Sequence, residues 1–145
     1  MTTPLWVLLA FSIWTLLVLF FGVGIYRVHR VLSGQAEMTE FRGGVDEGAP
    51  IYCRAMRAHA NCVEDLPIYA ALAVTAAIAG IDTPRLDQLA IAILIARIGQ
   101  SLVHMIFPET KATVGVRFAF FSVQLVAFFW MAIIIATTAL AAQMP

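Results

Sequence analysis

The chain has 145 residues, of which 61% are hydrophobic and 12% are charged, and its mean hydropathy is +0.89. Soluble domains contain about 45–50% apolar and about 25% charged residues, so this composition excludes an ordinary soluble protein. Nine basic and nine acidic residues cancel, so the overall charge gives no indication of nucleic-acid binding. The composition therefore predicts an integral membrane protein.

The first predicted membrane helix is the apolar run at residues 5–26, which contains only glycines and short hydroxyl residues as interruptions. About 20 helical residues cross the hydrocarbon core of a bilayer, so this run is long enough. A cleaved signal peptide is the competing interpretation. We set it aside because the run is too long, no basic residue precedes it, and Arg27 and Arg30 follow it at once.

A polar segment follows the first helix and leads into a second one. Glycine, glutamate and threonine at residues 31–50, with the Gly43-Gly44 pair as a breaker, predict a connecting loop with little regular structure. A second helix is expected from Ile51 to about Ile81, with its membrane part at 66–81. Pro67 lacks the N–H that a helix interior needs, so a kink is expected there.

Two more helices complete the predicted bundle. A tight turn precedes the third helix, and Asp82 or Thr83 is expected to cap that helix ahead of Pro84. The third and fourth helices are expected at 86–107 and 116–142, with a loop at 108–115 between them. We therefore predict one all-α membrane domain, residues 1–145, built as a four-helix bundle.

The basic residues predict an orientation, because loops that stay in the cytoplasm are enriched in lysine and arginine. The second connection carries only Arg85. The first and third connections and the helices beside them carry Arg27, Arg30, Arg42, Arg54, Arg57, Lys111 and Arg117. Both termini are therefore expected outside and both basic connections inside.

Polar residues are expected to form lines on three helices near the basic end. Arg54, Arg57, Asn61 and Glu64 recur at steps of three or four and share one face of the second helix, whereas His59 lies off that face. The third helix contributes Arg97, Gln100, Ser101 and His104, and the fourth contributes Arg117 and Gln124. Guanidinium, amide and carboxylate groups along one line suit a small zwitterion or anion.

Arg97 stands near the middle of the third helix, where an arginine costs about 2.5–3.5 kcal/mol on insertion scales. It is therefore expected to face the bundle and to pair with an acid, for which Glu64 is the candidate. Such a pair can set helix register or serve function, and the residues leave both open. The boundary arginines likewise have two interpretations, as ligand contacts or as topology signals that reach lipid headgroups.

No metal site and no disulfide are expected. Cys53 and Cys62 are the only cysteines, and they lie in a segment placed in or near the cytosol. His59 has no second histidine four residues later, so the pattern of a helical zinc site is missing.

The order Arg57-Ala-His-x-Asn-x-x-Glu64, followed by Pro67, with Arg97 in the third helix and Arg117 at the start of the fourth, resembles one known family. This is the family of membrane-associated proteins in eicosanoid and glutathione metabolism, the MAPEG family, which includes microsomal glutathione transferases and microsomal prostaglandin E synthase. The resemblance covers nearly the whole chain. It implies a homotrimer that binds glutathione between neighbouring subunits near the cytosolic face, and the lack of long extensions indicates a bacterial member, in the inner membrane.

The resemblance also implies roles for particular residues. Arg117 would be the catalytic residue that stabilises the glutathione thiolate, since a nearby cation lowers the pKa of a thiol. The implied glutathione-binding residues are Arg57, His59, Asn61, Glu64, Arg97 and His104, with Arg30, Arg54 and Gln100 as further candidates. The implied activity is that of a glutathione transferase or peroxidase acting on lipophilic electrophiles or hydroperoxides.

The sequence departs from the family pattern on two helices. Gln100 and His104 stand where many members carry tyrosines, and Phe118 and Phe121 stand where relatives carry polar residues. These departures leave open a second function, that of a membrane protein that binds lipid and does not use glutathione. A channel or transporter is a weaker alternative, because the polar lines gather at one end of the bundle and no internal repeat is visible.

Overall fold

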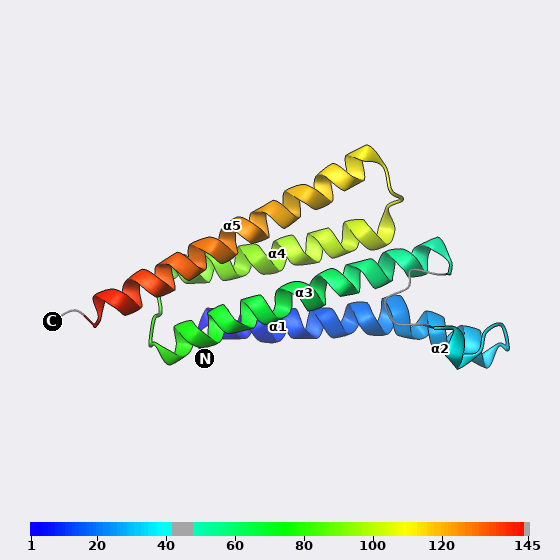
Figure 1. Cartoon of the computed structure of the whole chain (residues 1–145), viewed down its shortest axis with the longest axis horizontal. Coiled ribbons are helices and arrows are strands. Elements are labelled where there is room, and N and C mark those ends of the chain that lie inside the picture. Colours follow the sequence, from blue (N-terminus) through cyan, green and yellow to red (C-terminus); the bar gives the residue numbers. More distant parts are fainter. Residues whose placement is uncertain (42–47, 144–145) are drawn as a thin grey trace.

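The computed structural model describes residues 1–41 and 48–143, so Arg42 and the Gly43-Gly44 pair lie outside the described residues. Four long helical rods run side by side, and both termini lie at the same end of the bundle (Figure 1). The elements are α1 (Thr3–Leu17), η1 (Val18–Gly24), α2 (Ile25–Leu32), η2 (Met38–Glu40), α3 (Pro50–Ile78), α4 (Pro84–Ile106) and α5 (Lys111–Ala141). The predicted all-α fold with four helices able to span a membrane is confirmed.

The first rod is longer than the predicted helix. α1, the π-helical η1 and α2 follow one another without a break over Thr3–Leu32, a helix of 30 residues. At 1.5 Å per residue this rod is about 45 Å long, whereas the hydrocarbon core is about 30 Å thick. The α2 end therefore extends beyond the hydrocarbon, into the part of the sequence that was expected to be loop.

A glycine stops α3 before its expected end near Ile81. The N–H of Gly80 donates to the carbonyl of Ala77 at 3.2 Å, and the N–H of Ile81 donates to that of Ala76 at 2.9 Å. Gly80 has a φ of +67°, which only glycine adopts without strain. This pair of bonds around a left-handed glycine is the Schellman motif. α3 contains Pro67 within one continuous helix, and the kink there stays a prediction.

Threonines start both of the last two helices. The side chain of Thr83 accepts the N–H of Leu86 at 3.3 Å, which confirms the predicted cap of α4. Thr110 and Thr113 form a reciprocal capping box at the start of α5. Because this box starts α5 at Lys111, the prediction that the helix begins at residue 116 is wrong.

Each rod buries only a narrow stripe. α1 buries Val7, Phe11 and Thr15, which are spaced four residues apart, and it packs against α3 and α4. Large apolar side chains remain exposed on the outer surfaces; Phe129 and Trp130 of α5 are 65% and 46% exposed. A helix that is apolar on all sides is typical of a membrane span, where lipid contacts the outer face.

A buried ion pair joins α3 to α4 near the middle of the bundle. Arg97 is only 1% exposed, and its Nη2 donates to Oδ2 of Asp65. Its guanidinium carbon also lies 5.9 Å from the ring centre of Phe11 on α1. The prediction that Arg97 pairs with an acid inside the bundle is confirmed. The predicted partner, Glu64, is wrong. Glu64 precedes Asp65 by one residue, so its side chain points about 100° around α3 from that of Asp65 and is exposed.

We expect Asp65→Ala to destabilise the bundle by about 3–5 kcal/mol, since it leaves the Arg97 charge buried without a partner. Glu64→Ala, the matched control on the neighbouring position of α3, should change stability by less than about 1 kcal/mol. Thermal or denaturant unfolding in detergent measures both. Equal losses for the two variants would contradict the assignment of Asp65 as the partner.

Candidate functional site

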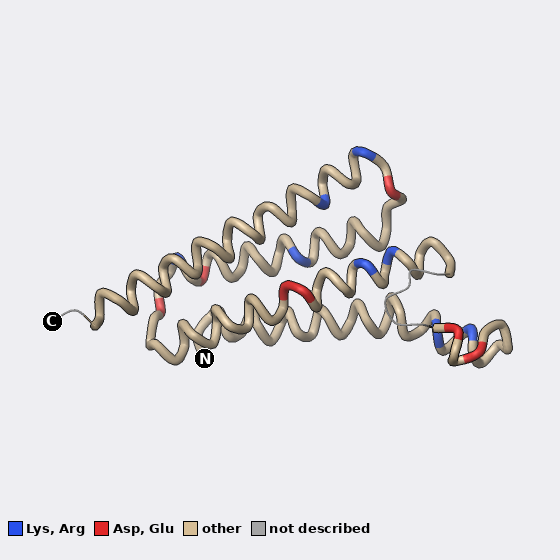
Figure 2. The backbone as a smooth tube through the Cα atoms, viewed as in Figure 1, with Lys and Arg blue, Asp and Glu red and all other residues tan. Residues whose placement is uncertain are grey.

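A polar cluster centred on His104 joins α3, α4 and α5. His104 is 9% exposed, and its Nδ1 lies 2.9 Å from Nη1 of Arg117 on α5. Its Nε2 lies 3.3 Å from Nδ2 of Asn61 on α3. Most lysine and arginine residues of α3, α4 and α5 lie in the half of the bundle away from both termini (Figure 2). The His104 cluster therefore lies at the basic end that the sequence predicted.

The contacts of His104 determine where its proton lies. A guanidinium group can only donate hydrogen bonds, so Nδ1 must accept the bond from Arg117. The imidazole is then neutral, with its hydrogen on Nε2. That N–H needs an acceptor, so we assign the Asn61 amide in the flipped orientation, with its oxygen in the place of Nδ2, 3.3 Å from Nε2. This arrangement holds the Arg117 guanidinium in a fixed position.

Glu109 places a carboxylate between two arginines of the predicted site. It forms an ion pair with Arg57, and its Oε1 lies 3.7 Å from Nη1 of Arg117. The Arg117 side chain is 12% exposed, whereas those of Arg57 and Glu109 are about half exposed. Sequence reasoning missed Glu109 because it lies in the connection between α4 and α5, where no helical periodicity indicates a neighbour. The only feature of the sequence that could have indicated Glu109 is its position directly before the Thr110 cap, which fixes where its carboxylate lies at the start of α5.

Glu64 lies on the same side of α3, one turn deeper than Asn61, and it is exposed on the surface of the chain. Within the described part of the chain its carboxylate is held by no hydrogen bond, and it interacts electrostatically with the buried charge of Arg97. A carboxylate in a membrane span is costly unless another group covers it.

Two of the predicted site residues belong to the bundle interior. Arg97 is bound to Asp65, as described above. Gln100 accepts a hydrogen bond from Gln124 of α5 at 2.9 Å, and both amides are buried. These residues lie behind the His104 cluster and hold the helices together.

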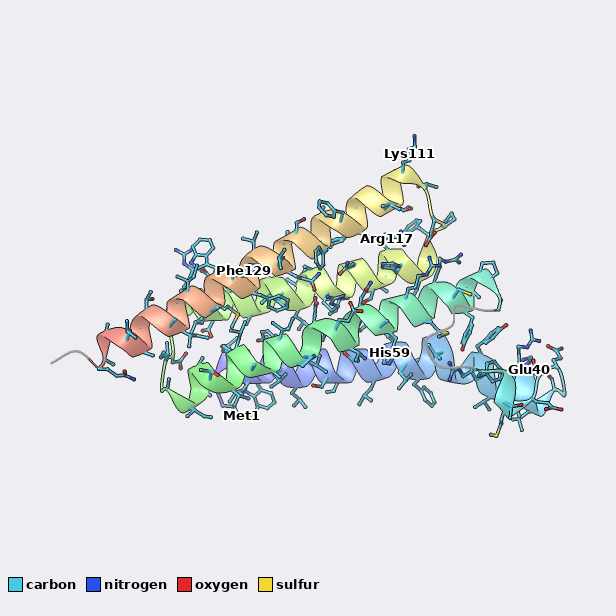
Figure 3. All side chains as sticks on the ribbon, in the orientation of Figure 1. Met1, Glu40, His59, Lys111, Arg117 and Phe129 are labelled. Carbon is cyan, nitrogen blue, oxygen red and sulfur yellow. The ribbon has the colours of Figure 1, made fainter. Side chains whose placement is uncertain are left out.

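Three other predicted residues point elsewhere. His59 lies on the α1 side of α3, away from Arg117 (Figure 3), beside the backbone of Thr15. Arg30 donates to a backbone carbonyl beyond the end of α2 at 2.9 Å. Arg54 donates through Nε to the carbonyl of Met105 at 3.4 Å. The structure thus brings together Arg57, Asn61, His104 and Arg117, and it places the remaining candidates outside this group.

The cysteines and metal ligands of the described residues give no second site. Cys62 carries a free thiol. Sγ of Cys62 lies 3.5 Å from Oγ of Ser101, deep in the core. In residues 1–41 and 48–143 no three His, Cys, Asp or Glu side chains are placed to hold a metal ion.

We expect ¹⁵N NMR of imidazole-labelled protein to show His104 as the neutral tautomer with its hydrogen on Nε2. In Arg117→Ala the bond to Nδ1 is lost, so the ring should exchange between both tautomers. His29, which is exposed on α2, is the internal reference. A hydrogen on Nδ1 in the parent protein would contradict the proposed arrangement of Arg117 and Asn61.

Comparison with known proteins identifies the family. The sequence matches the MAPEG family over residues 4–137, a range that includes α1 to α4 and most of α5. A search of curated proteins finds no match. The family match, together with four helices long and apolar enough to cross a bilayer, describes a multi-pass integral membrane protein. The chain belongs to the MAPEG family.

Proposed function

We propose that this chain binds glutathione at the His104 cluster and acts as a membrane glutathione transferase or peroxidase on lipophilic electrophiles or hydroperoxides. The supporting observation is the contact of Glu109 with Arg57 and Arg117. These two guanidinium groups already hold one carboxylate, and glutathione carries two. Planar guanidinium groups suit carboxylates because they donate parallel, charge-assisted hydrogen bonds.

In this proposal a glutathione carboxylate replaces the carboxylate of Glu109. Arg57 binds it at the exposed edge of the His104 cluster, and Asn61 offers its amide one turn deeper. Glu64 binds the ammonium of the γ-glutamyl group, which explains an exposed carboxylate at this depth. Because Arg57 and Glu64 lie at the protomer surface, we further propose that a neighbouring subunit of a homotrimer completes the site. The cluster then faces the cytoplasm of a bacterial inner membrane, opposite both termini.

The chemistry follows from the thiol of the bound glutathione. Arg117 stabilises the thiolate, and the proton leaves to water at the membrane edge. In transfer, the sulfur forms a bond to an electrophilic carbon, and the leaving group departs with the bonding electron pair. In the peroxidase reaction, two glutathione molecules are oxidised to the disulfide while the hydroperoxide is reduced to an alcohol and water.

We expect Arg117→Ala to lower kcat/KM for a halogenated aromatic or a lipid hydroperoxide by at least about tenfold, or about 1.4 kcal/mol. Its effect on glutathione affinity should be smaller, because Arg57 still binds the carboxylate. Arg85→Ala, an exposed arginine at the other end of α4, is the control. Equal rates for the two variants would remove Arg117 from the mechanism.

We expect Glu109→Gln to tighten glutathione binding several-fold, because the ligand no longer competes with an internal carboxylate for Arg57 and Arg117. Asp82→Asn removes an exposed acid from the opposite connection and should leave the Kd unchanged. Calorimetry in detergent measures both. If Glu109→Gln weakens binding, Glu109 supports the site and does not occupy the ligand position.

The second candidate function is lipid binding without glutathione. Phe118 and Phe121 are 68% and 40% exposed on α5, close to Arg117. Two exposed aromatic rings beside a cation fit a fatty acid as well as a lipophilic electrophile. In this alternative the His104 cluster holds the fatty-acid carboxylate, and glutathione has no measurable affinity.

A further inference from the structure

A surface groove lies on the α1 side of the bundle, at the same end as the His104 cluster. It has a volume of about 710 Å³ and is lined by η1, α2, α3 and the end of α4. Its walls include Phe21, Ile25 and Ile106, and its floor includes Ala55 and Met105. Ligand pockets commonly measure about 300–1,000 Å³, so this groove is large enough for one. No residue of α5 and no member of the His104 cluster lines it.

The apolar side chains of the groove are exposed on the surface of the chain. Phe21, Ile25 and Ile106 are 62%, 48% and 62% exposed. Gly22 allows η1 and α3 to pack closely at the base of the groove. A Cβ at this position would lie 2.9 Å from Cβ of Ala55 and would push η1 away from α3. η1 is π-helical, a conformation that is found frequently at functional sites. The groove is thus a built feature of the packing between η1 and α3.

One end of the groove is polar and basic. Tyr26, His29 and Arg54 line it, and among residues 1–41 and 48–143 no acidic side chain does. The bond from Arg54 Nε to the carbonyl of Met105 fixes this guanidinium at the rim. The rim lies toward the α2 end of the Thr3–Leu32 rod, the end that we expect to leave the hydrocarbon and reach the lipid headgroups. Basic pockets between membrane helices at this depth bind anionic lipid headgroups.

We propose that this groove binds one anionic phospholipid from the bilayer. An acyl chain lies along Phe21, Ile25 and Ile106, and the phosphate contacts Arg54 and His29. We choose an anionic phospholipid because its phosphate is complementary to the basic rim and its acyl chains are complementary to the apolar walls. Within one chain the groove shares no residue with the His104 cluster, and the proposal assigns Arg54 to lipid and not to glutathione.

Native mass spectrometry of the full-length protein, released from nanodiscs of equal phosphatidylglycerol and phosphatidylcholine, tests the proposal. The parent protein should retain phosphatidylglycerol in at least fivefold excess. Arg54→Gln should abolish this preference, whereas Arg85→Gln, the matched control at the other end of α4, should keep it. Ile25→Trp fills the apolar part of the groove and should lower retention of phosphatidylglycerol while Arg54 stays in place. Melting temperatures in the same nanodiscs show that each variant is folded.

Several results would overturn the proposal. Equal retention of both lipids by the parent protein would overturn it, and so would an Arg54→Gln variant that is indistinguishable from Arg85→Gln. Competition by glycerol phosphate, which has no acyl chains, would show a simple anion site. Displacement of the lipid by glutathione would assign Arg54 to the glutathione site. A lack of glutathione binding leaves the lipid result unaffected, so the two proposals fail separately.

Discussion

The ion pair between Arg97 and Asp65 is the constraint on which the positions of the other polar groups depend. A charge in the hydrocarbon core must be paired, and this requirement fixes how α3 and α4 are rotated and aligned. α3 and α4 run in opposite directions (Figure 1). Asn61 lies one turn before Asp65 on α3, and His104 lies two turns after Arg97 on α4. Because the helices are antiparallel, Asn61 and His104 meet on the same side of the ion pair, nearer the basic end of the bundle. The His104 cluster is therefore a consequence of the register that the deeper pair sets.

The membrane edge is where polar chemistry and lipid meet in this protein. The His104 cluster uses α3, α4 and α5, whereas the proposed lipid groove uses η1, α2, α3 and α4. Both sites include residues of α3 and α4. Two arginines one turn apart on α3 belong to different sites: Arg57 contacts Glu109 in the His104 cluster, and Arg54 contacts Met105 in the groove. The proposed glutathione transferase or peroxidase, which would join a water-soluble thiol to a lipophilic substrate, needs this kind of location.

Much of the fold was predictable because the bilayer imposes strong rules on a sequence. The four apolar runs, the Thr83 cap and the inward position of Arg97 all follow from length, turn chemistry and the cost of a buried charge. The ends of α3 and α5 were misplaced because the Schellman motif at Gly80 and the capping box at Thr110 depend on local hydrogen bonds that hydropathy does not reveal.

The candidate site was only partly predictable. Glu64 and Asp65 are adjacent acids, and periodicity alone cannot tell which of them faces Arg97, since packing sets the rotation of the helix. Glu109 was missed because loop geometry brings it to Arg57 and Arg117. His104 was placed correctly on the polar face of α4, but its link to Arg117 required the tertiary structure.

The measurement that tests the glutathione proposal most directly is calorimetric titration of the purified protein with glutathione in detergent. We predict a saturable isotherm, weakened at least about tenfold in Arg57→Ala and unchanged in Arg85→Ala. Ophthalmic acid, which keeps the carboxylates and the ammonium but lacks the thiol, should bind at the same site. No binding heat from a protein that is folded and retains its melting temperature, together with saturable binding of a fatty acid, would contradict the glutathione proposal and support the lipid-binding alternative.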